Sequence, residues 1–368
     1  MIEIGRAKRA TRVYSFDDIA IVPTRRTRSV GDVKMSWTID ALTFDFPIIA
    51  APMDSVMSPA TAIAFGKLGG LGILNLEGLW TRYEDPTPLL AELAEISDPV
   101  SATRRLQEVY AEPIKGELIT ERMRQIREAG VPVAGALSPQ RAVEFGPIVE
   151  KAAVDFFVIR GTTVSAEHVS SVDEPLNLKQ FIYSLDVPVI VGGCATYQSA
   201  LHLMRTGAAG VLVGFGGAAT RKTRNVLGVE VPMASAIADV AAARRDYLDE
   251  SGGRYVHVIA DGGLGRSGDI AKAIACGADA AMVSTPLARA EEAPGHGHHW
   301  GPEAWHPRLP RGERATFGPV GTLEEIMFGP SHTPDGTMNL VGALRKSMAT
   351  CGYTEVKEFQ RVEVVVRD

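Results

Sequence analysis

The sequence has 368 residues, of which 45% are hydrophobic and 22% charged, and these values are typical of a globular protein with a substantial core. The formal net charge of −6 provides no global electrostatic attraction for DNA or RNA, and no run of about 18 apolar residues predicts a membrane span. Three cysteines, without the spacing of a disulfide framework or a zinc site, favour a reducing compartment. We therefore expect a cytoplasmic protein without a bound metal.

Residues 1–45 are predicted to form an N-terminal arm. Its start is charged and lacks the apolar h-region of a signal peptide, and the stretch 6–34 is locally basic. The basic side chains favour a solvated arm or a contact between subunits. Contact with nucleic acid is disfavoured because no aromatic residues interleave to stack on bases.

Eight short apolar runs follow the arm, and each has the composition of a strand buried on both faces. Amphipathic helical stretches lie between most of them, and three such stretches separate the second run from the third. Because strands alternate with helices, we expect a single (β/α)8 TIM barrel that spans the chain. An open doubly wound sheet is disfavoured because PMDSV (52–56), rather than a G-x-G-x-x-G turn, follows the first run. The runs are 47–51, 71–74, 132–137, 154–160, 187–193, 209–215, 256–263 and 279–285.

The last part of the chain differs in composition from the barrel. Residues 286–340 are rich in Gly, Pro, His and Trp, and we expect them to form a flap over the barrel mouth. Residues 341–368 are predicted to form a tail with a helix and a final edge strand. Trp300 and Trp305 either stack on a purine ring or pin the flap. The flap histidines lack the spacing of a zinc site and are His296, His298, His299 and His306.

Functional groups of a barrel follow the carboxyl ends of its strands. After the seventh run, Asp261 is placed to accept two hydrogen bonds from a ribose diol, and Gly262 and Gly263 allow backbone N–H groups to approach a phosphate. After the eighth run, Ser284 and Thr285 complete a phosphate-binding cup. Ordinary turn chemistry is the alternative for both segments.

The loop GFGGAATRKTR (214–224) follows the sixth run. Its clustered glycines and basic side chains favour a loop that holds a substrate or an anion, and a plain turn is the alternative. Cys194, after the fifth run, is either a packed small residue or a displaced nucleophile, whereas Cys276 and Cys351 are expected to be structural.

Seven segments carry a family resemblance, namely SFDDIAIVP (15–23), AAPMDSV (50–56), GGLGIL (69–74), VIVGGCAT (189–196), 213–241, 258–295 and LVGALRKSMATCGYT (340–354). They resemble the IMP dehydrogenase/GMP reductase family. The resemblance implies a barrel that binds a purine nucleotide or related phosphate ester, uses NAD(P) for hydride transfer at purine C2, and assembles into a homo-oligomer, a tetramer or an octamer. Members usually carry a CBS pair after the second barrel helix. Here a short helical segment near 98–117 stands in that place, so no CBS domain is expected.

The resemblance also assigns residues to the site. Arg160 falls on the family's cofactor-side Asp, and Thr223 falls on the residue that helps to activate water after hydride transfer. The implied substrate-binding positions are Met53, Gly216, Gly217, Ala219, Arg224, Asp261, Gly262, Gly263, Ser284, Thr285 and Glu292.

Departures from the family pattern decide the expected chemistry. Arg221 stands where the family has the Cys that attacks purine C2, and a guanidinium has no lone pair to offer. The usual covalent route is therefore not expected. Ala219 replaces a phosphate-binding Ser, Ala50 a further phosphate-side Ser, and Gly193 an Asn. The family's monovalent-cation site uses carbonyls of this loop, including that of the Cys, so the cation is in question here.

Three functions of different classes remain open. The first is an oxidoreductase with an altered mechanism or substrate. The second is a catalytically silent protein that binds a nucleotide and assembles or regulates. The third is an FMN-dependent barrel of the nitronate monooxygenase type, which shares the APM and GGLG motifs, and a colourless purified protein excludes it.

Overall fold

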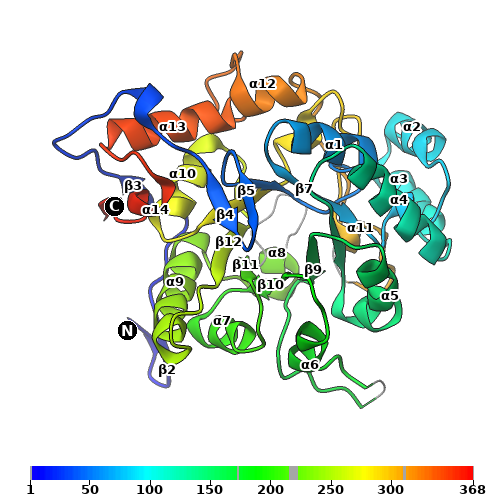
Figure 1. Cartoon of the computed structure of the whole chain (residues 1–368), viewed down its shortest axis with the longest axis horizontal. Coiled ribbons are helices and arrows are strands. Elements are labelled where there is room, and N and C mark those ends of the chain that lie inside the picture. The colour runs from blue at the N-terminus through cyan, green and yellow to red at the C-terminus, as the bar shows by residue number, and fades with distance from the viewer. Residues whose placement is uncertain (1, 172–173, 215–222, 310–311, 368) are drawn as a thin grey trace.

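The computed structural model describes residues 2–171, 174–214, 223–309 and 312–367, with a closed barrel of parallel strands at its centre. The eight predicted strands are confirmed, and so is the TIM-barrel fold expected from their alternation with helices (Figure 1). Each barrel strand pairs with both neighbours, and β13 closes the ring on β6. In chain order the strands are β6 (Ile48–Ala50), β7 (Leu71–Asn75), β8 (Ala134–Leu137), β9 (Phe156–Arg160), β10 (Val189–Cys194), β11 (Gly210–Val213), β12 (His257–Asp261) and β13 (Ala280–Val283).

Helices connect the strands, and capping side chains set where several of them begin. Ser58 accepts a hydrogen bond from the amide of Thr61 at the first helix, and Thr196 forms the same capping box with Ser199. The six-residue helix α6 was not predicted, because its apolar pattern is too short to show a helical period. The helices around the barrel are α1 (Pro59–Lys67), α2 (Thr87–Glu95), α3 (Pro99–Val109), α4 (Gly116–Glu128), α5 (Pro139–Lys151), α6 (Leu178–Tyr183), α7 (Tyr197–Met204), α8 (Thr223–Leu227), α9 (Met233–Glu250) and α10 (Ser267–Ala275).

A short hairpin closes the amino-terminal end of the barrel. Its strands β4 (Trp37–Ile39) and β5 (Leu42–Phe44) pair antiparallel and lie across the barrel in Figure 1. The Trp37 and Phe44 rings stack with centroids 5.6 Å apart, and Nε1 of Trp37 donates to Nδ1 of His257, the first residue of β12, at 3.3 Å. Aromatic side chains therefore fill this end, and the cavities of the barrel lie at the opposite, carboxyl-terminal end.

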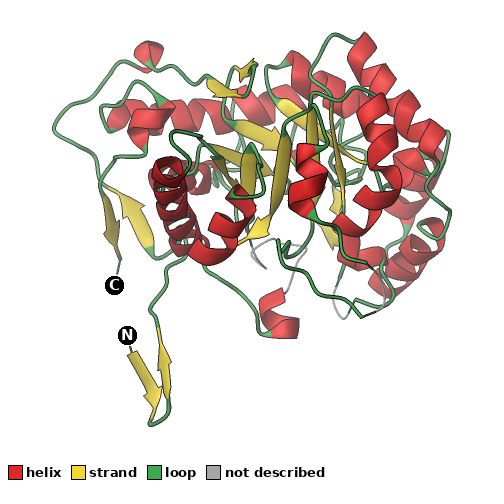
Figure 2. Ribbon diagram, turned by 60° about the horizontal axis from the view of Figure 1, so that its bottom comes forward, coloured by secondary structure: helices red, strands yellow, loops and turns green. Residues whose placement is uncertain are grey.

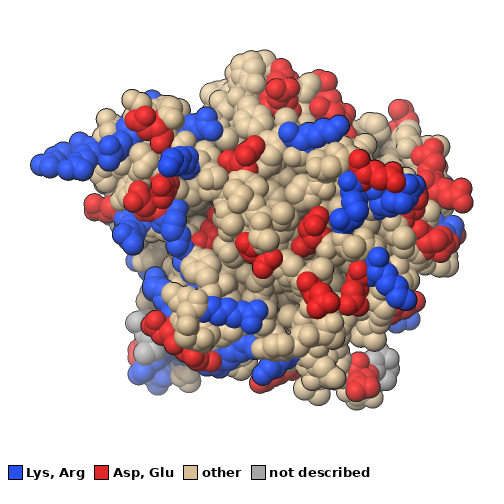
Figure 3. All heavy atoms as spheres, in the orientation of Figure 1, with Lys and Arg blue, Asp and Glu red and all other residues tan. Residues whose placement is uncertain are grey.

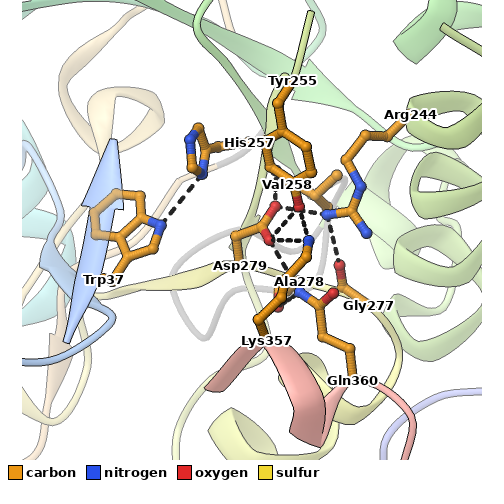
Figure 4. Close-up of polar contacts among 10 residues, drawn as sticks. All are labelled: Trp37, Arg244, Tyr255, His257, Val258, Gly277, Ala278, Asp279, Lys357 and Gln360. Carbon is orange, nitrogen blue, oxygen red and sulfur yellow. Dashed lines mark hydrogen bonds and ion pairs between the residues drawn. The ribbon is translucent and has the colours of Figure 1, made fainter. Parts of the chain in front are cut away.

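A buried polar cluster lies beside the hairpin, at the same end of the barrel (Figure 4). Its centre is the carboxylate of Asp279, which is 5% exposed. The donors come from α9, from the segment just before β12 and the second residue of β12, and from the tail helix α14 (Val356–Phe359) and the residue after it. They are Nη1 of Arg244 (2.6 Å), the hydroxyl of Tyr255 (2.6 Å), the amide of Val258 (2.8 Å), Nε2 of Gln360 (3.0 Å) and Nζ of Lys357 (3.1 Å). The cluster thus fastens the tail to the barrel.

The N-terminal arm has more structure than its sequence predicted. Strands β1 (Ile2–Gly5) and β2 (Lys8–Ala10) form a hairpin that projects from the body (Figure 2). Strand β3 (Ile19–Ile21) pairs antiparallel with the final strand β16 (Val364–Val366). The tail contains the helix α13 (Leu340–Thr350), so its predicted helix and edge strand are both confirmed.

The flap consists of short elements, none of which has a clear hydrophobic period. They are η3 (Leu287–Arg289), β14 (His298–His299), α11 (Pro302–Trp305), β15 (Ala315–Thr316) and α12 (Leu323–Phe328), with β14 and β15 paired antiparallel. On the face drawn in Figure 3, acidic and basic side chains are interspersed rather than gathered into one field. In the part of the chain that the structure describes, no helix has the length and apolar character to cross a membrane.

Candidate functional site

Two adjoining cavities open at the carboxyl ends of the barrel strands. The smaller, of about 550 Å³, lies over the ends of β12 and β13 and is called the β12–β13 cavity. The larger, of about 1090 Å³, lies over the ends of β6 to β9 beneath the flap and is called the flap cavity. Met53 and Arg160 line both cavities, so these two side chains form the wall between them.

The shape of the β12–β13 cavity follows from glycines at the ends of two strands. At Gly214, after β11, an added Cβ would lie 1.5 Å from the carbonyl oxygen of Asp261, so only glycine allows these two strand ends to approach each other. After Asp261, the chain turns through Gly262 (φ +138°) and Gly263 (φ +67°), both left-handed conformations that favour glycine. None of the described residues accepts a hydrogen bond from the amides of residues 262–265. These amides are suited to bind an anion.

The structure brings most of the described, sequence-predicted residues to this cavity. Gly216, Gly217, Ala219 and Arg221 lie outside the described residues. The predicted residues that line the β12–β13 cavity are Met53, Arg160, Arg224, Asp261, Gly262, Gly263, Ser284 and Thr285.

Two predicted residues lie outside the linings of both cavities. Thr223 is buried at the start of α8, beside the lining residue Arg224, and its Oγ1 has no hydrogen-bond partner among the described residues. Glu292 is exposed, and its Oε2 accepts a hydrogen bond from the amide of Leu323 at 2.8 Å, at the start of α12. The roles that the family resemblance implies for these two residues stay predictions.

An ion pair crosses the barrel mouth between Arg160, at the end of β9, and Asp261, at the end of β12. Nε of Arg160 donates to Oδ2 of Asp261 at 2.9 Å, and Nη2 donates to Oδ1 at 3.2 Å. The two side chains are only 9% and 11% exposed. The sequence analysis placed each residue at the barrel mouth but did not predict that they pair. A basic and an acidic side chain at two strand ends of one barrel could have suggested this ion pair.

A second carboxyl group, Asp54, lies at the wall of the flap cavity and is 2% exposed. Its Oδ2 accepts hydrogen bonds from the hydroxyl of Tyr110, the amide of Leu79 (3.2 Å) and Nδ2 of Asn75 (3.4 Å). Burial raises the pKa of Asp54 to about 6, despite these donors. Burial also raises the pKa of Tyr110 well above its usual value, so this hydroxyl keeps its proton.

The flap tryptophans pack against Tyr110, which follows α3. Nε1 of Trp300 donates to the Tyr110 hydroxyl at 3.0 Å, and Trp300 is only 2% exposed. The Trp305 ring is stacked on the Tyr110 ring, with centroids 4.5 Å apart and planes 5° from parallel. This arrangement favours the interpretation that the tryptophans pin the flap. Tyr110 was not predicted from the sequence, since it lies in the helical segment near 98–117, for which the family resemblance quotes no matching motif.

The cysteine and histidine candidates are held in packing and hydrogen-bonding contacts. Cys194 is 1% exposed, and burial raises its pKa to about 12, so its thiol is a packed small group and not a nucleophile. Nδ1 of His299 lies 2.8 Å from Oγ of Ser55, and the His298 ring contacts Oγ1 of Thr316 at 3.0 Å. Within the described ranges, no three His, Cys, Asp or Glu side chains are grouped as metal ligands.

Comparisons with known proteins agree with this geometry. The family model of the IMP dehydrogenase / GMP reductase domain matches residues 13–302. The chain belongs to the IMP dehydrogenase/GMP reductase family. An uncharacterized oxidoreductase of Mycolicibacterium smegmatis is 52% identical over 373 residues, with all of both chains covered. The inosine-5'-monophosphate dehydrogenase of Methanocaldococcus jannaschii is 25% identical and covers 95% of this chain and 92% of its own length.

A solved structure is also similar. The IMP dehydrogenase/GMP reductase-like protein of Corynebacterium glutamicum is 52% identical and superposes with a TM-score of 0.94, covering all of this chain and 97% of its own. The family resemblance stated from the sequence is therefore confirmed. It places the chain in an oxidoreductase family.

Proposed function

We propose that this member of the family binds a purine nucleoside monophosphate in the β12–β13 cavity and does not catalyse the family's reaction through a covalent intermediate. The observation that carries the proposal is the set of donors at the ends of β12 and β13. The amides of residues 262–265 have no described acceptor, and Ser284 and Thr285 line the same cavity. Backbone amides and hydroxyls of this kind, at the last two strands of a TIM barrel, are suited to hold a phosphate.

Arg224 supports the same assignment from the rim of the cavity. Its side chain is 68% exposed and lies 3.6 Å from Glu230, a weak surface ion pair that a phosphate can displace. Arg221, where the family has its nucleophile, adds positive charge to the loop but cannot attack purine C2. Binding without covalent chemistry is the function that this set of residues serves best.

The flap cavity fits NAD(P), the cofactor that the family resemblance implies, only in part. It is large enough for part of a dinucleotide, and Arg82 and Arg141 in its lining could hold phosphates. At its inner end, however, Arg160 replaces a carboxylate, and a guanidinium cannot accept the hydrogen bonds of a carboxamide. We therefore derive no hydride-transfer step, and NAD(P) binding stays an expectation from the family alone.

A thermal-shift series tests nucleotide binding. IMP or GMP at 100 times its dissociation constant stabilises the folded state by about 2.7 kcal/mol, and with about 2.1 cal/mol/K of unfolding entropy per residue this is about 3 °C in a chain of 368 residues. Inosine and guanosine, which lack the phosphate, are expected to give little shift. Thr285→Val should reduce the shift, whereas Thr120→Val on the exposed face of α4 should not. No shift with any purine nucleotide at millimolar concentration would refute the proposal.

Two further measurements separate the alternatives. IMP with NAD and GMP with NADPH are expected to give no turnover above background, and measurable turnover favours the oxidoreductase with an altered mechanism. Flavin absorbance in the purified protein favours the FMN-dependent alternative. Light scattering tests the expected tetramer or octamer.

A further inference from the structure

The ion pair between Arg160 and Asp261 bears on which nucleotides this cavity accepts. Asp261 is the residue that the family resemblance assigns to the ribose diol. In this chain its two carboxylate oxygens each accept a hydrogen bond from the guanidinium of Arg160, at 2.9 and 3.2 Å. Two parallel bonds between a guanidinium and a carboxylate form the strongest and most directional of the common side-chain pairs.

A ribose diol would need the same bidentate face of the carboxylate. Its two hydroxyls donate to two acceptors, as the guanidinium does, so the diol and Arg160 compete for Asp261. The exchange favours Arg160, because a diol brings neutral donors in place of charged ones and would leave the guanidinium of Arg160, only 9% exposed, without its partner.

We propose that Arg160 takes the place of the ribose diol on Asp261, so that the cavity binds phosphate esters with little regard to a vicinal diol. The expected ligand class is purine nucleoside monophosphates of either ribose or deoxyribose, held by phosphate and base. This inference rests on the proposed nucleotide binding. It assigns Arg160 as a specificity-determining residue at the wall that the two cavities share.

Isothermal titration with paired ligands tests the inference, using GMP against 2′-deoxy-GMP and IMP against 2′-deoxy-IMP. The wild-type protein is expected to bind the members of each pair within about threefold of each other. Arg160→Met removes the guanidinium and keeps the volume, so the two hydrogen bonds from Arg160 to Asp261 are lost and the diol no longer competes with them. A hydrogen bond to a charged group contributes about 1.5–3 kcal/mol, and the variant should therefore prefer the ribonucleotide by about tenfold or more.

Two further variants make the result specific to the ion pair. Arg160→Lys keeps the charge but cannot form the two-pronged contact, so it should give an intermediate preference, and it also serves if Arg160→Met does not fold. Arg141→Met is the matched control, because this arginine lines only the flap cavity and should leave the ratio unchanged.

The outcomes are distinguishable. A wild-type preference for the ribonucleotide of about tenfold or more overturns the inference but supports nucleotide binding. Equal affinities in the wild-type protein, in Arg160→Met and in Arg160→Lys also overturn the inference, because Asp261 then does not hold a diol in any form. If neither the wild-type protein nor the variants bind any of the four nucleotides, the proposed function itself fails.

Discussion

Replacing Asp279 with Ala removes the centre of the buried cluster at the amino-terminal end of the barrel. The substitution leaves Arg244 without its carboxylate partner, and the Arg244 side chain is only 7% exposed. Breaking a buried ion pair by removing one partner costs about 3–5 kcal/mol of unfolding free energy. The tail also loses the contacts that Gln360 and Lys357 make with the carboxylate. We therefore expect a loss of about 4 kcal/mol.

The magnitude can be converted into a melting temperature. With about 2.1 cal/mol/K of unfolding entropy per residue, 368 residues give about 0.8 kcal/mol/K, so a loss of about 4 kcal/mol lowers the melting temperature by about 5 °C. Urea unfolding followed by circular dichroism gives the free energy, and calorimetry gives the temperature.

The matched control is Glu250→Ala. Glu250 also pairs with an arginine through two hydrogen bonds, from Nε and Nη2 of Arg205 at 2.8 and 2.7 Å, but this pair lies at the surface with both side chains 45% exposed. Exposed pairs contribute little, so we expect no clear change. If Asp279→Ala destabilises no more than Glu250→Ala, the reasoning from burial is refuted. The double variant Asp279→Leu with Arg244→Met should recover part of the loss, because no buried charge is left alone.

Three other substitutions or treatments test separate parts of the structure. Burial raises the pKa of Asp54 from 3.8 to about 6, so the contribution of the protonated carboxyl group to stability is fully present below pH 3.8 and is lost as the pH rises through 6. Urea unfolding should therefore show the free energy of unfolding falling between pH 4 and 6, and Asp54→Asn should remove the part of this fall that Asp54 causes. Cys194 should resist iodoacetamide at pH 8 in the native protein and react after denaturation, and its labelling in the native state, detected by mass spectrometry, would contradict its burial. Gly214→Ala should destabilise the protein and abolish the nucleotide-induced thermal shift, since the new Cβ would lie 1.5 Å from a backbone oxygen, whereas Gly268→Ala, with nothing within 4 Å, should do neither.

The sequence predicted the barrel well because buried parallel strands leave a clear signal. Runs such as 187–193 are apolar throughout, and each of the eight became a barrel strand. The same method failed for short elements. The hairpin β4–β5 and helix α11 have three or four residues each, too few to show a period, and their positions depend on contacts distant in sequence, such as that of Trp37 with His257.

The positions of several candidate site residues were predicted, but the contacts between their side chains were not. Strand ends located Asp261, Ser284 and Thr285, because a barrel places functional groups there. The flap cavity was not foreseen, since its wall combines Asp54 from the first strand region with Tyr110 from a segment for which the family resemblance quotes no matching motif. Side-chain pairing across a barrel depends on which side chains reach one another in three dimensions, and a linear pattern does not contain that information.

Arg160 and Asp261 are best understood as a matched pair rather than as one lost and one retained family residue. With the family's Asp at position 160, two carboxylates would stand at the same barrel mouth and repel each other unless a ligand lay between them. Arginine at this position turns that repulsion into two hydrogen bonds with little solvent exposure, and it does so at the wall shared by both cavities. A single substitution therefore changes both sides of the mouth at once, removing an acceptor from the flap cavity and occupying an acceptor in the β12–β13 cavity. The family resemblance places Arg221 at the position of the family's nucleophile, and a guanidinium cannot take that role. We therefore propose that the chain binds a phosphate ester in the β12–β13 cavity without the family's covalent chemistry at the base.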